Sequence, residues 1–310
     1  MNLVESNIFY TFMPLSISTF NKVKENPETQ AELNKASLYL IAKREVPIIS
    51  VIDKSELTKE LTAYSKDQYV LLRIELKIAS YQIDAAYIFP PEINKDEFIA
   101  DLSAITIEDL LFWNTRGYGS FLWRGEIGPI CTYEMLYVGE CVGEDLTTRF
   151  KAHHALQDIL IEERAISPDF DRTEEIILFP CAISSNTISS INKESSAKDI
   201  RKMITNSFNF GMKEVTLDSE KALVHNLTPK YNSIIFKNYP ESADGLYNTD
   251  ANAYSYYISE LSMFKYDTGI LQGCPNPLYA STIVGDKEGH TTIYGPGEKK
   301  TWNMFDSSKC

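Results

Sequence analysis

The chain has 310 residues, enough for two domains with sizeable hydrophobic cores. Its apolar fraction of 44% and its charged fraction of 24% are ordinary for a globular protein. No apolar run reaches the length of about 18 residues that a transmembrane helix requires, so we expect no membrane span. The net charge of −13 argues against a protein that coats nucleic acid without specificity, although a local basic groove remains compatible with it.

The N-terminal sequence and the cysteines both predict a cytoplasmic location. The first five residues, Met1–Glu5, lack the basic segment and apolar run of a secretory signal. The five cysteines are odd in number and show no Cys-x-x-Cys spacing of the kind that binds zinc. We therefore expect reduced thiols, as in cytosolic proteins.

Residues 1–113 predict an N-terminal α/β region. The composition of Pro27–Tyr39 favours a helix. Residues Gln68–Phe89 alternate between apolar and polar with a period of two, which predicts two half-buried strands, the second from Tyr81. A further helix is predicted to start at Thr106. Two roles stay open for this region, namely recognition of a target or partner and a plain structural scaffold.

Residues 114–240 predict the functional core. Asn114–Gly119 contains two glycines and is interpreted as a hinge. Gly119–Glu126 and Ile130–Gly139 are predicted to form a hairpin around the turn Gly128-Pro129. This hairpin would bring Tyr118 or Phe121, at the start of its first strand, close to Tyr137 near the end of its second strand.

The stretch after the second predicted strand gathers polar groups of three kinds. The strand ends at Tyr137-Val138-Gly139, and Asp145 is a suitable N-cap for a helix from Leu146 to about Ala165. Arg149 and His153 are four residues apart, so they share one face of that helix. A phenol, a guanidinium and an imidazole therefore converge on one place, and a guanidinium is well shaped to hold a phosphate.

A third strand and an inserted helix follow. Glu174–Ile183 contains a continuous apolar run, which predicts a strand buried on both faces. Ser184–Ser196 is predicted as a loop and Ala197–Phe208 as a helix. The segment Lys193–Lys237 is more basic than the chain average, and two interpretations stay open for it: a solvated helix face and a surface that contacts phosphates.

Glu220 lies on a short predicted helix that Pro229 stops. It falls on the same stripe as Leu223 and Leu227, so its carboxylate is expected to face inward. An inward carboxylate needs a partner, and a divalent cation would supply one.

Residues 241–310 predict a β-rich, tyrosine-rich extension with strands at His290–Tyr294 and Lys299–Phe305. One interpretation is a cap packed on the core. The other uses the tyrosines, with Asn248, Asn252 and Asn303, as contacts to nucleic acid bases.

Taken together, residues 118–237 resemble the GIY-YIG nuclease family. The family's second motif, its Arg-x-x-x-His helix, its metal-binding glutamate and its closing Pro-x-x-Asn motif occur in this order. They correspond to Tyr137-Val138-Gly139, to Arg149 and His153, to Glu220, and to Pro229-Lys230-Tyr231-Asn232.

Two positions depart from the family pattern. The first motif is not intact, and the nearest candidate is Gly119-Ser120-Phe121, which follows Tyr118. The residue after the second motif is often lysine in the family and is Glu140 here. If Phe121 replaces the first tyrosine, one catalytic hydroxyl is missing, and the resemblance then leaves room for reduced or lost activity.

The resemblance implies a fold, a reaction and a set of roles. The fold is of the α+β class, with a small antiparallel sheet flanked by helices. The reaction is metal-dependent endonucleolytic hydrolysis of DNA, with Mg²⁺ or Mn²⁺ on the glutamate; RNA stays open as a substrate. Large flanking regions favour a restriction or defence enzyme, and a homodimer is expected. The implied catalytic residues are Tyr137, Arg149, His153, Glu220 and Asn232, with Tyr118, Lys151 and Lys230 as substrate-binding residues.

Structural interpretations stay open beside these roles. Tyr137 fits a core aromatic, Arg149 a surface ion pair, and Glu220 a partner of Lys198 or Arg201. The alternative function is a catalytically weak or inactive module that keeps the fold in order to bind nucleic acid or protein.

Overall fold

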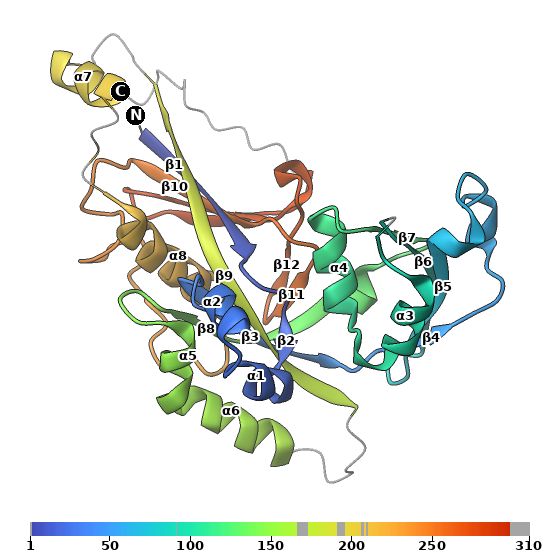
Figure 1. Ribbon diagram of the computed structural model, residues 1–310. Coiled ribbons are helices and arrows are strands. Elements are labelled where there is room, and N and C mark those ends of the chain that lie inside the picture. Colours follow the sequence, from blue (N-terminus) through green and yellow to red (C-terminus); the bar gives the residue numbers. More distant parts are fainter. Residues whose placement is uncertain are drawn as a thin grey trace.

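The computed structural model describes residues 2–90, 92–165, 173–190, 196–205, 208 and 210–297. The protein is a mixed α/β structure with a large, curled ten-stranded sheet and a four-stranded antiparallel sheet (Figure 1). Helices flank both sheets, so the α+β class predicted from the sequence is confirmed at this level. No helix within these residues is long and apolar enough to cross a membrane.

The large sheet has the strand order β12-β11-β8-β3-β9-β1-β10-β13-β14, and β2 pairs with β9 off this path. Neighbouring strands are antiparallel except for the β1–β10 and β8–β11 pairs. The sheet takes strands from all three regions of the chain, so it does not follow the predicted division. Its strands are β1 (Asn2–Tyr10), β2 (Leu15–Ser16), β3 (Leu38–Glu45), β8 (Thr132–Glu140), β9 (Glu174–Ser189), β10 (Ala253–Ile258), β11 (Met263–Tyr266), β12 (Gly269–Gln272), β13 (Thr282–Asp286) and β14 (Thr291–Tyr294).

The small sheet has the order β4-β5-β6-β7 and lies on the right of Figure 1. The alternating stretch Gln68–Phe89 forms β5 and β6, which confirms the two predicted strands. Thr106 caps α4 by accepting from the Asp109 N–H at 3.2 Å, as expected for a helix start. The elements here are β4 (Ile48–Val51), β5 (Tyr69–Leu76), β6 (Tyr81–Ile88), β7 (Ser120–Trp123), α3 (Lys95–Ala100) and α4 (Ile107–Thr115).

The predicted hairpin of β7 with β8 is wrong. β7 pairs with β6, where Phe121 lies opposite Tyr87, whereas β8 pairs with β3 and β11 in the other sheet. The glycines and the turn between the two strands suggested a local connection. Each strand instead buries its apolar residues against a partner that is more distant in sequence, and Phe121 is 3% exposed in that packing.

Helices cover the two faces of the large sheet around β3. Tyr39 and Ile41 face a cluster formed with α1 (Ile17–Val23), α2 (Pro27–Leu33), α5 (Leu146–Arg149) and α6 (His154–Ala165). Leu38 and Leu40 face the other way, into the core that includes α8 (Met212–Leu227). This alternation explains why Leu38–Ala42 is continuously apolar, since a central strand covered on both faces has no exposed side.

Several predicted boundaries shift. The helix expected over Pro27–Tyr39 ends at Leu33, and β3 begins at Leu38. The loop expected over Ser184–Ser196 is partly strand, because β9 continues to Ser189 by pairing with β1. The inserted helix is α7 (Ala197–Thr205). The strand predicted at Lys299–Phe305 lies outside the described residues.

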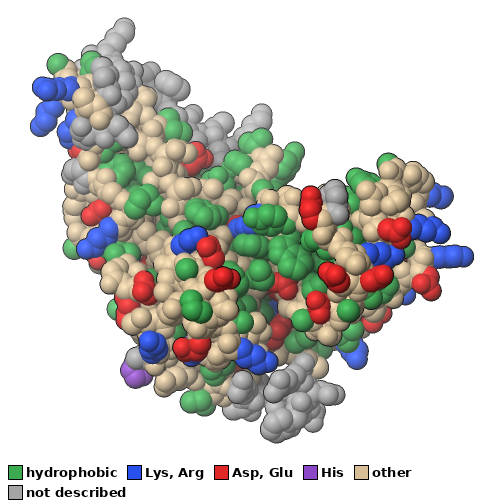
Figure 2. Space-filling view, viewed as in Figure 1, with side chains coloured by type: hydrophobic (Ala, Val, Ile, Leu, Met, Phe, Trp, Pro, Cys, Tyr) green, Lys and Arg blue, Asp and Glu red, His purple; other side chains and the backbone are tan. Residues whose placement is uncertain are grey.

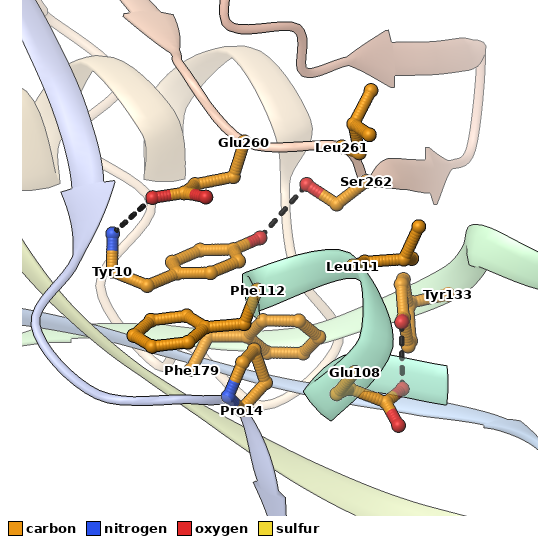
Figure 3. A pocket seen from close by; sticks show the side chains of 10 residues that line it. All are labelled: Tyr10, Pro14, Glu108, Leu111, Phe112, Tyr133, Phe179, Glu260, Leu261 and Ser262. Carbon is orange, nitrogen blue, oxygen red and sulfur yellow. Dashed lines mark hydrogen bonds between the residues drawn. The ribbon is translucent and has the colours of Figure 1, made fainter. Parts of the chain in front are cut away.

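Buried ion pairs join α4 to the large sheet. Glu108 of α4 is 3% exposed and accepts from Arg44 Nη2 at 2.7 Å and from the Tyr133 hydroxyl at 2.7 Å. A second pair links Arg116 to Glu260 at 2.8 Å. Between them lies a cavity of about 10 Å³ lined by Tyr10 and nine other residues (Figure 3), which is room for one water molecule.

Charge is unevenly distributed on the molecular surface (Figure 2). Lys and Arg side chains gather over α7, at the upper left, and at the outer end of the small sheet, on the right. On α7, Lys198 and Arg201 are exposed, whereas Lys202 pairs with Asp250 at 2.8 Å. The two interpretations of this basic segment therefore both stay open.

Candidate functional site

The second half of β8 is held on both edges. β3 pairs along one edge, with Tyr39 opposite Gly139. Along the other edge, the Tyr231 N–H donates to the Leu136 carbonyl at 3.0 Å. The Asn232 side chain accepts from the Val138 N–H at 3.0 Å and donates to the Val138 carbonyl at 2.7 Å. Asn232 therefore fixes the backbone of the Tyr137 strand, and its amide replaces a missing neighbouring strand.

Two tyrosines lie side by side at this point. The rings of Tyr39 and Tyr137 are stacked, with 5.9 Å between their centroids and an interplanar angle of 25°. Gly139 makes this possible, because a Cβ there would come within 2.4 Å of the Tyr39 hydroxyl. The glycine of the Tyr-Val-Gly motif is thus needed for the close approach of the second phenol.

His153 contacts the Tyr39 hydroxyl. Its Nε2 lies 2.6 Å from that oxygen, and its Nδ1 accepts from the Leu156 N–H at 2.9 Å. Burial first and the neighbouring Arg149 charge next lower the pKa of His153 to about 4, so the imidazole is neutral at pH 7. With Nδ1 as the acceptor, the single ring proton lies on Nε2, which then donates to Tyr39.

The helix predicted from Leu146 to Ala165 is interrupted. α5 ends at Arg149, a short 3₁₀ turn follows, and α6 begins at His154. The break occurs because His153 is extended, with φ −85° and ψ 93°, and its ring caps the first turn of α6. Arg149 and His153 are therefore not on one helical face, although both act on Tyr39.

The start of α5 also differs from the prediction. Asp145 occupies the N-cap position but makes no capping hydrogen bond. Asn34 Oδ1 takes this role, accepting from the Thr147 N–H at 3.2 Å and from its hydroxyl at 3.0 Å. The N-terminus of α5 is thus tied to the end of α2 rather than to its own aspartate.

Arg149 lies beside both phenols at the surface. Its side chain is 43% exposed, and its Nη1 lies 3.8 Å from the Glu144 carboxylate. The Tyr39 hydroxyl first, and then other neighbours that include Glu140 and Tyr137, raise the pKa of Arg149. The side chain is thus charged, accessible and only weakly paired, which suits the binding of an anion.

Glu220 lies in the middle of α8 and is half-buried. Within the part of the chain that the structure describes, no hydrogen bond or ion pair reaches its carboxylate, and none joins it to Lys198 or Arg201. Burial first and the Glu140 charge next raise the pKa of Glu220 to about 7, although Lys221 and Arg149 act in the opposite direction. The helix stops at Leu227, just before Pro229, as predicted.

Two buried tyrosines anchor α8 through Asp218. Asp218 is fully buried and accepts from the Tyr239 hydroxyl at 2.9 Å, from the Tyr256 hydroxyl at 2.5 Å and from the Leu246 N–H at 2.9 Å. Because Tyr254 and Tyr256 are buried, they cannot stack on bases, and the packed-cap interpretation holds for them. Asn303 lies outside the described residues.

The three predicted substrate-binding residues lie in different parts of the fold. Tyr118 is 61% exposed and precedes β7 of the small sheet, whose strands do not pair with β8. Phe121 is buried there, so it does not occupy the place beside Tyr137. Lys151 is exposed in the turn after Arg149. Lys230 pairs with Glu163 at 2.8 Å.

Two residues of the site were not recognised from the sequence. Tyr39 was assigned to a helix, although the run Leu38–Ala42 reads equally well as a buried strand with one hydroxyl in it. Glu140 was noted only as a departure from the family pattern. The carboxylates available for a cation are Glu220 and Glu140, and the described residues hold no group of three or more His, Cys, Asp or Glu with metal-binding geometry.

No family model matches the chain, and no curated protein or solved structure does either. The geometry and chemistry of this site are therefore the basis for any functional proposal.

Proposed function

We propose that this protein is a metal-dependent endonuclease that hydrolyses phosphodiester bonds in DNA. The observation that carries the proposal is the gathering of two stacked phenols, a neutral imidazole, a weakly paired guanidinium and an uncompensated carboxylate. These groups come from β3, β8, the α5–α6 segment and α8. Each of them has a use in phosphoryl transfer, which depends on positioned acid–base groups and on stabilisation of negative charge.

Tyr39 strengthens the resemblance to the GIY-YIG nucleases. It stands in Leu38-Tyr39-Leu40-Ile41, on the strand next to the Tyr-Val-Gly motif, and supplies the second phenol that Phe121 could not. With Tyr39 in this place, the proposed site has two phenol hydroxyls. The site residues we propose are Tyr39, Tyr137, Arg149, His153 and Glu220, with Asn232 holding the strand.

The hydrogen-bond directions suggest which phenol accepts a proton. His153 donates to Tyr39, which leaves the Tyr39 hydroxyl proton free to point at Tyr137. Burial raises the pKa of Tyr137, and the Tyr39 hydroxyl opposes this rise by stabilising a phenolate. We assign to the Tyr137 phenolate, formed by loss of its proton to solvent, the role of the base that takes the proton of the attacking water and becomes neutral. Tyr39, held by His153, would stabilise that phenolate before the attack.

Arg149 and Glu220 would stabilise the negative charges of the phosphate, Arg149 directly and Glu220 through a bound cation. The exposed Arg149 would bind the scissile phosphate and exchange its contact with Glu144 for it. Glu220 would hold Mg²⁺ or Mn²⁺, and the two ions' preference for oxygen ligands fits a carboxylate that lacks a protein partner. When bound there, such an ion neutralises charge on the leaving oxygen.

The test is cleavage of supercoiled plasmid DNA with Mg²⁺ or Mn²⁺. The wild-type protein should nick or linearise the plasmid, and Arg149→Lys should lower single-turnover cleavage by roughly a hundredfold while changing DNA binding much less. A parallel RNA substrate addresses the nucleic acid class, and sedimentation addresses the predicted homodimer. Binding without any cleavage by the wild type would favour the alternative, a non-catalytic binding module.

A further inference from the structure

Glu140 is the last residue of β8, and its register directs it toward Glu220. In the β3–β8 pair, Leu38 lies opposite Glu140 and Leu40 lies opposite Val138. Residues directly opposite in an antiparallel pair point to the same face. Leu38, Leu40 and Val138 belong to the core that contains the apolar residues of α8. The Glu140 side chain therefore lies on the face of the sheet that α8 covers.

Glu220 approaches the same place from α8. It precedes Leu223 and Val224, which are buried in that core, and α8 packs directly on β8. Two carboxylates thus come from facing elements, one from a strand end and one from a helix. The Glu140 charge also acts on Glu220, in agreement with carboxylates that lie near each other.

The two cations near this pair, Lys221 and Arg149, act on the charge of Glu220 but form their ion pairs with other carboxylates. Lys221 is 5% exposed and pairs with Asp244. Arg149 lies 3.8 Å from Glu144, and Tyr39, Glu140 and Tyr137 also act on its charge. Glu140 itself accepts from the Val142 N–H through one oxygen, and among the described residues no hydrogen bond or ion pair is formed with its other oxygen. Two neighbouring carboxylates without a dedicated cation are unfavourable unless one of them is protonated or an ion binds between them.

We propose that Glu140 is a second carboxylate ligand and that Glu140 and Glu220 together hold one divalent cation. The inference rests on the proposed function and deepens it. Mg²⁺ in enzymes is typically held by one or two carboxylates with water in the remaining positions, so two glutamates form a complete protein contribution. The acidic residue that departs from the family pattern after Tyr-Val-Gly thus becomes part of the ion site.

The ion site has a direct binding test that does not depend on cleavage. Mn²⁺ is titrated into the full-length protein by calorimetry, with the wild type, Glu140→Gln, Glu220→Gln and the control Glu144→Gln. The control removes the same charge from an exposed position in the loop that follows β8. We expect Glu140→Gln and Glu220→Gln each to weaken Mn²⁺ binding by roughly tenfold or more and Glu144→Gln to change it by less than about twofold.

A second variant at Glu140 tests whether a positive side chain can replace the bound ion. In Glu140→Lys, the ammonium would neutralise Glu220 and take the place of the ion, so Mn²⁺ binding should disappear while circular dichroism shows a folded protein. Unchanged Mn²⁺ affinity in Glu140→Gln or Glu140→Lys, or an effect of Glu144→Gln as large as that of Glu140→Gln, would overturn the inference, as would absence of binding by the wild type.

The outcomes also separate this inference from the proposed function. Loss of binding in Glu220→Gln alone overturns the role of Glu140 and leaves the endonuclease proposal standing. Binding that needs both glutamates, in a wild-type protein that cleaves neither DNA nor RNA, supports the ion site and overturns the nuclease.

Discussion

Two regions of the molecule bury carboxylates in opposite ways. At the junction of α4 with the large sheet, Glu108 has an arginine and a tyrosine hydroxyl as donors, and at the anchor of α8 Asp218 has three donors. Glu220, only two residues from Asp218 on the same helix, has no such donor among the described residues. Buried charges are normally paired, and removing a partner from a paired one is costly.

These two arrangements indicate different roles for the carboxylates. At Glu108 and Asp218 the surrounding residues complete the hydrogen bonding, so these groups fix one arrangement of helix and sheet. At Glu220 the strongest neighbour after burial is another negative charge, which is unfavourable for the free protein. A strongly shifted group of this kind, beside an exposed arginine and two phenols, is the pattern of a functional site.

The largest change is expected at Glu220, where a substitution should lower cleavage without lowering stability. Glu220→Gln removes the group that we propose to hold the cation, so single-turnover cleavage should fall by roughly a thousandfold. The same change removes a half-buried charge that has no hydrogen-bond or ion-pair partner among the described residues, so the free energy of unfolding in EDTA at pH 8 should stay the same or rise. Cleavage assays and urea unfolding on the two proteins check this. A clear loss of stability would mean that Glu220 is a partnered structural residue like Asp218.

The paired region should respond in the opposite sense. Arg44→Met leaves Glu108 buried without its cation and should lower the free energy of unfolding by about 3–5 kcal/mol. The double variant Arg44→Met/Glu108→Leu removes both charges and should recover much of this loss. Urea unfolding of the single and double variants measures the coupling between the two residues. If the double variant is no more stable than Arg44→Met, the ion pair does not hold α4 in the way described.

The phenols offer a matched comparison of the same two regions. Tyr39→Phe removes the hydroxyl that links His153 to Tyr137 and should lower cleavage by roughly a hundredfold. Tyr133→Phe removes a hydroxyl that donates to Glu108 and should instead cost about 1–3 kcal/mol of stability with little change in cleavage by the folded protein. Tyr118→Phe should alter neither quantity. Full activity in Tyr39→Phe would return the first-motif role to another residue.

The sequence predicts the local parts of this structure well and its long-range pairing poorly. Period-two alternation located β5 and β6, and capping chemistry located α4, because both signals lie within a few residues. The pairing of β3 with β8 joins residues about a hundred positions apart in sequence, with the whole small sheet between them. No local signal reports such a contact, so the sequence pattern offers Gly119-Ser120-Phe121, which is near Tyr137 in sequence, rather than Tyr39.

The same limit explains which candidate site residues could be predicted from the sequence. Arg149, His153, Glu220 and Asn232 follow Tyr137 at spacings that a family pattern records, so they could be proposed without a structure. The contribution of Tyr39 depends on strand order. The carboxylate pair of Glu140 and Glu220 depends on which face of the sheet α8 covers, which no spacing encodes.

The smallest expected effect concerns the dependence of stability on pH. Burial and Glu140 raise the pKa of Glu220 from its ordinary value near 4.5 to about 7 in the folded protein. Between these two values the folded state binds more protons than the unfolded state, so its stability falls as the pH rises. The destabilisation caused by the charged Glu220 carboxylate is complete above pH 7 and absent below about pH 4.5.

Comparison of the wild type with Glu220→Gln isolates this contribution from the other titrating groups. In EDTA, the free energy of unfolding of the variant should rise by about 1–3 kcal/mol relative to that of the wild type between pH 4.5 and pH 8. Most of this change should occur between pH 5 and pH 7. Saturating Mn²⁺ at pH 8 should remove the difference, because the ion stabilises the charged carboxylate. For Asp218→Asn, loss of a satisfied carboxylate should instead leave the variant less stable than the wild type at pH 8. Equal pH profiles for the wild type and Glu220→Gln would show that Glu220 is compensated after all, and would remove the contrast between the two regions.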